Sequence, residues 1–596
     1  MADVAICVVC VVLAGAMLTG AGLQLDSINA HRKEMKLIVN EPLENAPPSL
    51  AFATVAMGAF RGLVVDVLWM RADKLKEEGQ FFDARQLAEW ITALQPRFAA
   101  VWEFHAWNMA YNISVAIPAS QPEQRWRWVK NGYELLRDKG IPLNPKAINL
   151  YRELGRIFQH KIGDVADDAH KYYKLQLALA IEPLLGSADN KYFDELVAAP
   201  RQWAEIVADP NVEQLVGRLK AADDAFAKSD PGEFISNYLS LRQNAGRFAS
   251  TAGQAIDAFR GSKALERFDV FARAYELRNG WKLEPELMRE LNRTYGPVEW
   301  RDPNTHLPLD WRHPDSHALY WAIKGLKIVL QDQGREIEAA ETNADRMVAH
   351  ALQNLFRNGK LFIYSAPVEV SSEDPSQPPQ VQMVKEVFLR PDLRMFDAYN
   401  RSAMAIIEKY KESDRSGRQE SLQNGHRNML INALLMFYQA GHKEQAQRIY
   451  SELRRLYPRP DFDVSLLEFA RRRMLEELDR IGIHDAKEQT IGLLREAYYL
   501  FAIHDDDGAF GRESLAKEIY DHYNSIYNEG ERIDLPSFNV LRYLSLIDFL
   551  NDERHPIYFR QNLLSRVKAE RPDLFKQLEA EEDKLQNESE QQGQTG

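Results

Sequence analysis

Two stretches of the chain repeat one spacing of large and small residues. The members of the first are Leu68, Ala72, Gly79, Ala84 and Pro96, and those of the second are Phe437, Gly441, Ala446, Tyr450 and Pro458. Apolar residues recur at helical intervals on both sides of each glycine, which predicts two helices joined by a turn. Small residues let the helices cross closely, and large ones fill the space between hairpins. Because one such hairpin cannot bury its apolar face alone, the spacing predicts a stack of helical hairpins.

Three further segments carry the first-helix part of the same pattern. Trp102 follows Leu68 by 34 positions, which is one full repeat. The residues in phase are Trp102 and Ala106, then Tyr151, Gly155 and Phe158, and finally Trp321 and Gly325. Gly155 occupies the small position of its helix. We therefore expect the second helix of the same hairpin, which contains Tyr173, to pass close to Gly155.

With these units the chain resembles the tetratricopeptide repeat family, and in layout it is similar to uncharacterised membrane-anchored members from bacteria. The resemblance covers roughly residues 60–185 and 316–530. It is carried mainly by LVVDVLWMRADKLKEEGQFFDARQLAEWITALQPRFAAVWEFHAWNMAYN and by FYQAGHKEQAQRIYSELRRLYP. Leu434, Lys324 and Ala88 depart from the family pattern. The resemblance implies a right-handed superhelix whose concave face binds peptides or partner proteins, and it implies no single activity.

The predicted fold class is all-α, a tetratricopeptide-like helical-hairpin solenoid with one small β-hairpin insertion and an N-terminal transmembrane helix. The expected segments are a transmembrane anchor at 4–23, a linker at 24–49, N-terminal repeats at 50–183, a helical insertion with a Pro/Trp-rich loop at 184–315, repeat-like helices at 316–356, a β-hairpin insertion at 357–390, C-terminal repeats at 391–575 and a disordered acidic tail at 576–596.

The anchor is predicted from the apolar run Val4–Leu23. Twenty residues at a rise of about 1.5 Å match a hydrocarbon core of about 30 Å. A secretory signal peptide is the alternative, but no Lys or Arg precedes the run and the run is long for a signal peptide. We therefore expect a single-pass membrane protein bound to the bilayer through residues 4–23. The basic residues after the run favour a cytoplasmic domain, but acidic neighbours dilute that signal and leave the side of the membrane open.

A second apolar stretch, Leu50–Trp69, is interrupted by Arg61 and Asp66. A charge at the bilayer centre costs several kcal/mol. We therefore expect this stretch to open the repeat domain as a helix outside the bilayer, with a second membrane span as the alternative.

The charge balance argues against nucleic acid as a partner. The 596 residues include 74 Lys and Arg against 87 Asp and Glu, a formal net charge of −13. A chain this acidic has no overall field that attracts phosphate backbones. The two cysteines, Cys7 and Cys10, lie inside the apolar run, so we expect neither disulfides nor thiolate metal sites in the folded part.

The segments between the repeats give four expectations. Charged helices are predicted at 211–228 and 234–259. The Pro-rich segment 295–314 cannot form a continuous helix, and we expect an ordered loop docked by Trp300 and Trp311. Alternating residues in KLFIYSAPVEV and QVQMVKEVFL predict the β-hairpin. The β-hairpin has two possible roles: it contacts a partner protein, or it is an insertion found only in some lineages.

No nucleotide-binding, metalloprotease or nucleophile-elbow motif occurs, and no cofactor is expected. His306, His313 and His317 are the weak metal candidates, because His313 and His317 are four apart and share a helical face. We favour instead a structural reading in which Asp315 and Ser316 cap a helix that begins near His317.

A basic aromatic patch comprises Arg125, Trp126, Arg127, Trp128 and Lys130. Stacking on nucleic acid or binding to lipid headgroups is one reading. Because the chain is acidic overall, we expect an amphipathic helix with solvated Arg side chains.

The expected function is a non-enzymatic, membrane-tethered scaffold that recruits or assembles partner proteins or peptides. The alternatives are an envelope enzyme whose site lies near the 295–317 loop and a purely structural envelope component.

Overall fold

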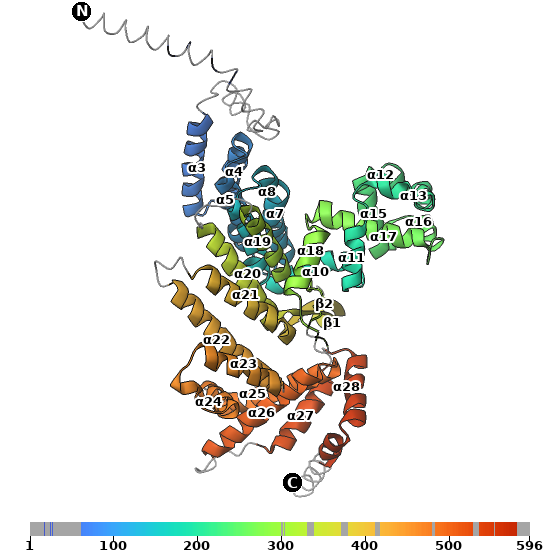
Figure 1. Ribbon diagram of the computed structural model, residues 1–596. Coiled ribbons are helices and arrows are strands. Elements are labelled where there is room, and N and C mark those ends of the chain that lie inside the picture. The colour runs from blue at the N-terminus through green and yellow to red at the C-terminus, as the bar shows by residue number, and fades with distance from the viewer. Residues whose placement is uncertain are drawn as a thin grey trace, which may run out of the picture. The chain divides into compact units, whose positions relative to one another are not determined.

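The computed structural model describes Met17, Thr19, Gln24 and Ser27, and then the following ranges: residues 61–299, 302, 304–330, 339–370, 380–411, 418–440, 442–478, 483–527, 536–552 and 555–580. These residues are mostly helical (Figure 1). The predicted anchor and linker lie almost wholly outside the described residues. Within the described ranges, no helix combines the length and apolar composition that a membrane crossing requires.

The chain divides into two compact units. Unit 1 comprises Met1–Tyr173, Tyr275–Glu284 and His317–Val348, and unit 2 comprises Lys174–Ala274, Pro285–Ser316 and Ala349–Gly596.

In chain order, the first helices are α3 (Arg61–Glu77), α4 (Phe81–Leu94), α5 (Ala99–Trp107), α6 (Ser114–Ala116), α7 (Pro122–Leu135), α8 (Ile141–Leu143), α9 (Ile148–Arg156), α10 (His170–Ile181), α11 (Asn190–Ala198), α12 (Trp203–Val207), α13 (Pro210–Ala222), α14 (Asp224–Ala227), α15 (Pro231–Gln243), α16 (Ser250–Asp257), α17 (Lys263–Tyr275) and α18 (Pro285–Tyr295).

The later elements are α19 (Pro314–Leu330), α20 (Ala339–Asn358), β1 (Lys360–Val370), β2 (Gln380–Arg390), α21 (Phe396–Lys409), α22 (Arg418–Gln439), α23 (Lys443–Leu456), α24 (Leu466–Leu478), α25 (Ile483–Ala502), α26 (Asp506–Tyr527), α27 (Phe538–Asn551) and α28 (Ile557–Glu570). Short 3₁₀ turns lie at Glu182–Leu184, Ala245–Arg247, Leu393–Met395 and Pro460–Phe462.

Helices α3 and α4 form the first predicted hairpin. Gly79, at the turn, has φ +77°, a left-handed conformation that glycine adopts without steric cost. The next amide, Gln80 N–H, donates to the carbonyl of Leu75 at 2.8 Å and closes the end of α3. Ala72 and Ala84 are fully buried, as expected for the small positions. The predicted hairpin over 68–96 is confirmed.

Helices α22 and α23 form the second predicted hairpin. Phe437, Ala446 and Tyr450 are all buried. The Tyr450 hydroxyl donates to the carbonyl of Phe462 at 3.0 Å, which fixes the chain beyond α23. Gly441, predicted at the turn, lies outside the described residues.

Four of the described helices end in π-helical turns that the sequence pattern did not predict. These turns span Asn108–Ile113 after α5, Leu136–Gly140 after α7, Ile157–Ile162 after α9 and Glu276–Gly280 after α17. A π turn inserts one extra residue into the helical repeat. The third of them contains the predicted signature residue Phe158.

Gly155 lies at a close helix crossing, but not with the expected helix. A Cβ atom at Gly155 would meet Met347 of α20 and Ala318 of α19, whereas the prediction placed the helix of Tyr173 there. Helix α9, which contains Gly155, meets α19 a second time at Gly325. A Cβ added to Gly325 would lie 2.9 Å from the Cβ of Tyr151 in α9. Helices α9 and α19, both predicted as first helices of repeat hairpins, therefore pack antiparallel on each other. The prediction that Gly155 meets the second helix of its own hairpin, within residues 151–183, is wrong.

Strands β1 and β2 form the predicted β-hairpin, paired antiparallel from Lys360 opposite Arg390 to Val370 opposite Gln380. Leu361 and Val387 are buried against α10 at Leu175 and Ala178. Alternate residues of the hairpin base thus face one helix, as the period of two requires.

Three other expectations need correction. The predicted helix 211–228 breaks at Asp223, whose extended backbone and side chain begin α14. The predicted helix 234–259 breaks after α15 at Asn244, which also has a non-helical backbone. The predicted tail is helical over residues 576–580, with Leu578 buried against Leu563; residues 581–596 lie outside the described residues.

Candidate binding site

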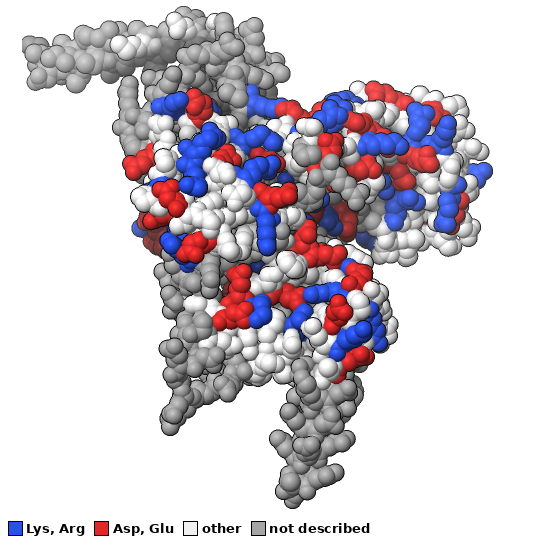
Figure 2. Space-filling model, turned by 60° about the horizontal axis from the view of Figure 1, so that its bottom comes forward, with Lys and Arg blue, Asp and Glu red and all other residues white. Residues whose placement is uncertain are grey.

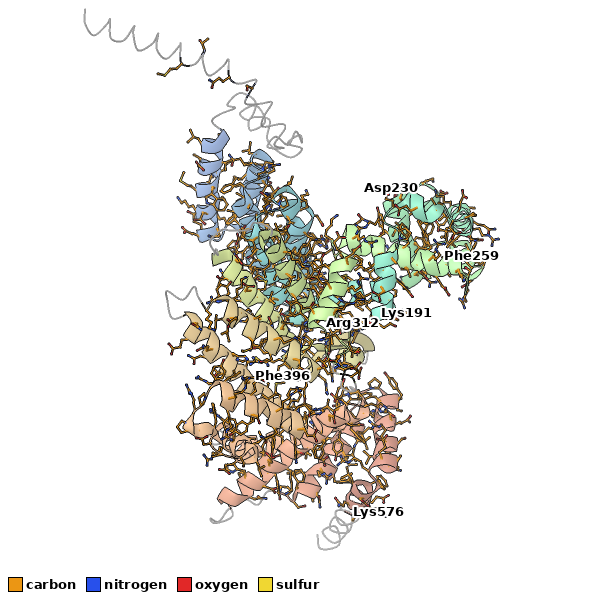
Figure 3. All side chains as sticks on the ribbon, in the orientation of Figure 1. Lys191, Asp230, Phe259, Arg312, Phe396 and Lys576 are labelled. Atoms are coloured by element: carbon orange, nitrogen blue, oxygen red, sulfur yellow. The ribbon has the colours of Figure 1, made fainter. Side chains whose placement is uncertain are left out.

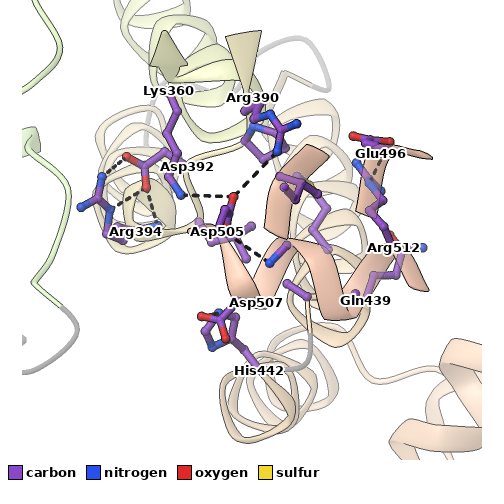
Figure 4. Close-up of a pocket in the computed structure, with 17 residues that line it drawn as sticks. Lys360, Arg390, Asp392, Arg394, Gln439, His442, Glu496, Asp505, Asp507 and Arg512 are labelled. Atoms are coloured by element: carbon purple, nitrogen blue, oxygen red, sulfur yellow. Dashed lines mark hydrogen bonds and ion pairs between the residues drawn. The ribbon is translucent and has the colours of Figure 1, made fainter. Parts of the chain in front are cut away.

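A charged cavity of about 120 Å³ lies within unit 2 at the base of the β-hairpin (Figure 4). Its walls come from the ends of β1 and β2, the segment that follows β2, the C-terminal end of α22, α25 and the N-terminal end of α26. Its charged lining residues are Lys360, Arg390, Asp392, Arg394, His442, Glu496, Asp505, Asp507 and Arg512. Segments more than a hundred residues apart therefore contribute to one site.

The N-terminal end of α26 reaches the cavity because two local features place it there. Asp505 caps the helix, with its Oδ1 accepting the N–H of Gly508 at 3.2 Å. One turn later, Gly511 lies against the backbone of Gln439 so closely that a Cβ would overlap its carbonyl oxygen. Only glycine permits this approach of α26 to the end of α22.

Three of the four carboxylates in the cavity are held by partners within hydrogen-bonding distance. Asp392 receives two hydrogen bonds from Arg394, both of 2.8 Å. Glu496 lies 3.1 Å from Arg512, and the Nε2 of His442 lies 3.1 Å from Asp507. Asp392 and Glu496 are therefore each neutralised by an arginine.

The fourth carboxylate, Asp505, faces two cations at longer range. Its Oδ2 lies 3.9 Å from the Nζ of Lys360 and 4.0 Å from an Nη of Arg390. The Arg390 guanidinium is buried over the ring of Tyr499, at 4.7 Å from the ring centroid. Burial lowers the pKa of Arg390 from its usual value, although a guanidinium still remains charged at neutral pH.

A second cavity of about 530 Å³, also in unit 2, lies beside the 295–312 loop. Arg312 spans its wall, bonded to Asp310 at 2.9 Å, to Glu182 at 3.1 Å and to the carbonyl of Leu361 at 3.0 Å. Figure 3 labels Arg312 near the hairpin. The charged side chains among the described residues of this wall are Glu182, Asp310, Arg312, Lys360, Asp392 and Arg394.

The described part of the loop packs against α18 through Trp311. The indole Nε1 of Trp311 donates to Asn292 Oδ1 at 3.0 Å, and Trp311 is fully buried. A Cβ at Gly296 would collide with the carbonyl oxygens of Leu307 and Asn292, so the loop folds tightly back on α18. Trp300, the other predicted anchor of the loop, lies outside the described residues.

The three histidines predicted as weak metal candidates each have local contacts. His306 Nδ1 lies 2.8 Å from the carbonyl of Gly296. His317 is buried and stacks on Phe158 with centroids 4.9 Å apart. No group of three or more possible metal ligands occurs among the described residues.

His313 takes the capping role that the sequence had assigned to Asp315 and Ser316. Helix α19 begins at Pro314, and the Nδ1 of His313 accepts the N–H of Asp315 at 3.1 Å. The Asp315 carboxylate instead accepts from Asn354 at 3.0 Å. The prediction that this helix begins near His317 with Asp315 and Ser316 as caps is therefore wrong by about one turn.

The basic aromatic patch forms part of α7, as expected, but its first arginine is not solvated. Arg125 is buried and donates to Asp167 at 3.0 Å, while Arg127 and Lys130 are exposed. On the face drawn in Figure 2, Lys and Arg side chains are interspersed with Asp and Glu.

The repeat-signature residues serve mainly as core and turn residues. Most are buried, and the ones at turns, Gly79 and Pro458, are exposed. Those in the described ranges lie in the core, at helix crossings or at turns, and none of the described ones lines either cavity. The cavity residues Lys360, Arg390 and Asp505 were not predicted, because their local sequence has no feature that distinguishes them from other surface charges.

No protein-family model and no curated protein matches the chain. Among solved structures, the chain is similar to the one described as Naa15/Naa10 bound to HypK-THB, with 11% identity. The match covers 89% of this chain and 83% of that chain, with a TM-score of 0.12. A likeness at that TM-score carries no argument, so the reading of the fold and site rests on this chain alone.

Proposed function

We propose that the chain is a membrane-tethered scaffold of tetratricopeptide type that recruits partner proteins and catalyses no reaction of its own. The observation that carries the proposal is the charged cavity at the hairpin base. Its side chains are cations and carboxylates on rigid elements, an arrangement that can bind a polar partner group. Charged residues paired in this way supply binding energy and specificity, whereas general acid–base catalysis needs an unpaired group held near a substrate.

The repeats and the apolar run support the remaining parts of the proposal. Helical hairpins that stack on small residues give a rigid frame on which binding residues keep their positions. The apolar run Val4–Leu23 has the length and composition of a membrane span. A tethered frame of this kind raises the local concentration of whatever it binds at the membrane.

The test is crosslinking in cells followed by mass spectrometry on the full chain. We expect crosslinks from one recurrent partner to Lys360, which lines the cavity. A variant with Arg394→Glu, which places like charges against Asp392, should lose these crosslinks while the protein remains at normal abundance. Recovery of no recurrent partner, or crosslinks that the variant leaves unchanged, would count against the scaffold proposal.

A further inference from the structure

Helix α3 presents a stripe of apolar side chains on the outside of unit 1. Leu63, Val67 and Met70 recur at intervals of four and three positions, which places them on one face of the helix. The three residues are 62%, 59% and 64% exposed. Single apolar residues are ordinary on a protein surface, but three in line on one helix form a continuous patch, and such patches mark contacts with another body.

The opposite face of α3 fixes the direction in which this stripe points. Val65 and Ala72 are buried, and the ring of Trp69 lies 5.8 Å from that of Phe98 and 5.1 Å from that of Phe104. Val65 belongs to a core cluster with residues of α4 and α5. Turning the stripe inward would pull these side chains out of that core, so the stripe stays on the outside.

The outer face of α3 changes from apolar to charged along the helix. The next position in line with the stripe is Lys74, whose side chain is 74% exposed, and exposed Glu77 ends the helix. Asp66 and Arg71 are also exposed, and the helical spacing places them on the two flanks of the stripe. A helix that approaches a bilayer obliquely needs this order, because its apolar end enters the acyl boundary while its charges stay among headgroups and water.

The direction of this change agrees with the path of the chain. The apolar run Val4–Leu23, proposed above to span the membrane, precedes α3, and residues 24–60 join the two. The apolar end of α3 is therefore the end joined to the anchor. A tethered bilayer meets the helix at a high effective concentration, so a patch of three side chains suffices for a contact that a free protein would not hold.

We propose that the stripe of Leu63, Val67 and Met70 rests on the surface of the bilayer that carries the anchor, and so orients unit 1 against the membrane. The inference rests on the proposed membrane tether and adds a second, peripheral contact to it. Helix α3 has 17 residues, and among the described ranges no helix has the length and apolar composition of a membrane span. The contact is therefore with the boundary between headgroups and acyl chains.

The test places one nitroxide label at a time on the full chain in phosphatidylcholine vesicles. The background carries Cys7→Ser and Cys10→Ser, which removes the two native cysteines. Molecular oxygen concentrates in hydrocarbon and a nickel chelate stays in water, so their relative effects on the label report its surroundings. We expect oxygen to have the larger effect at Cys variants of the three stripe positions, and the nickel chelate at Lys74→Cys. Val165→Cys, at a residue of unit 1 that is 74% exposed outside the stripe, is the matched control and should follow the nickel chelate.

The contrary outcomes are distinct from one another. A larger nickel effect at the stripe would place it in water and overturn the inference. Little effect of either reagent would mean that protein covers the stripe, which also overturns it. Spin–spin broadening at Val67→Cys that disappears on dilution with unlabelled protein would assign the stripe to a second copy of the chain instead. If an alkaline wash strips the unaltered chain from the vesicles, the tether and this inference fall together, whereas an anchored chain with its stripe in water removes this inference alone.

Discussion

Gly155 faces the sulfur of Met347, and a Cβ atom added to Gly155 would stand 2.5 Å from it and 3.3 Å from the carbonyl oxygen of Ala318. The two residues lie 192 positions apart in the sequence. The close packing here compensates for a glycine inside a helix, which alone costs roughly 1 kcal/mol against alanine.

Gly155→Leu should destabilise the protein by about 1–3 kcal/mol or more, because the crossing of α9 with α19 and α20 has no room for the side chain. Gly155→Ala should cost less than about 1 kcal/mol, since the flexible end of Met347 can move and alanine gains helix propensity. Urea melts measure the free energy of unfolding of both variants. Gly217→Ala is the control, because a Cβ there meets nothing within 4 Å, and it should stabilise. A Leu variant as stable as the unaltered chain would contradict the assigned crossing.

Gly511→Ala should be more damaging than Gly155→Ala. At Gly511 the obstructing atom is the backbone carbonyl oxygen of Gln439, which cannot rotate away as a methionine side chain can. We expect a loss of at least about 2 kcal/mol in urea melts, together with faster amide exchange at the start of α26. Gly492→Ala, where a Cβ meets nothing within 4 Å, is the matched control. Similar melts for Gly511→Ala and Gly492→Ala would show that α26 does not approach α22 this closely.

The parts of the fold that were predictable from sequence are those set by residues near one another in the chain. The hairpin of α3 and α4 follows from Ala72, Gly79 and Ala84, and the β-hairpin follows from a period of two over 360–370 and 380–390. Each depends on a local turn and a local apolar face.

The choice of helix partners was not predictable in the same way. The small residue at Gly155 signals a close crossing but does not identify the partner helix, and only the packed structure selects Ala318 and Met347. The π-helical turn at Ile157–Ile162 shifts the helix phase without a distinctive sequence signal. The cavity depends on Lys360 and Asp505, 145 positions apart, and no local pattern connects them.

Asp167→Asn should destabilise unit 1 by about 3–5 kcal/mol, because it leaves buried cations without their carboxylate. Asp167 lies 2.5 Å from Lys161 and 3.0 Å from Arg125, and all three side chains are less than a tenth exposed. These cations and the Ala169 amide hold the pKa of Asp167 below its usual value although burial alone would raise it. Asp168→Asn, at the exposed neighbouring position, is the control. Equal melting for both variants would show that the buried cluster does not contribute to stability.

Removal of residues 1–25 should release the protein from membranes in a folded, helical form. The removed part contains the apolar run Val4–Leu23, and the remainder has an ordinary balance of charged and apolar residues. Fractionation after an alkaline wash, with circular dichroism of the released protein, measures both expectations. If the shortened protein stays in the membrane pellet, residues 50–69 act as a second anchor and the single-pass topology is wrong.

The stability of the protein should fall as the pH drops below about 6.5, because three buried histidines resist protonation. Burial lowers the pKa of His105 to about 3, and those of His313 and His426 to about 4. In the unfolded chain each titrates near 6.5. Between these values the unfolded state binds more protons than the folded state, so the stabilisation is complete above pH 6.5 and is lost as the pH falls toward the folded-state values. At pH 5 the loss is roughly 2 kcal/mol for each histidine.

Urea melts between pH 7.5 and 5 measure how steeply the free energy of unfolding changes with pH. The variant His105→Leu isolates the contribution of one histidine to this slope. Both ring nitrogens of His105 are buried without a hydrogen-bond partner among the described residues. Replacing the ring therefore removes a group that gains a proton on unfolding, without breaking a bond that the folded protein makes. The variant should lose about a third of the pH dependence. His504→Asn, at an exposed position with a positive φ that asparagine tolerates, is the comparison variant for a histidine replaced at the surface. A slope that His105→Leu does not reduce would mean that water reaches this ring in the folded protein.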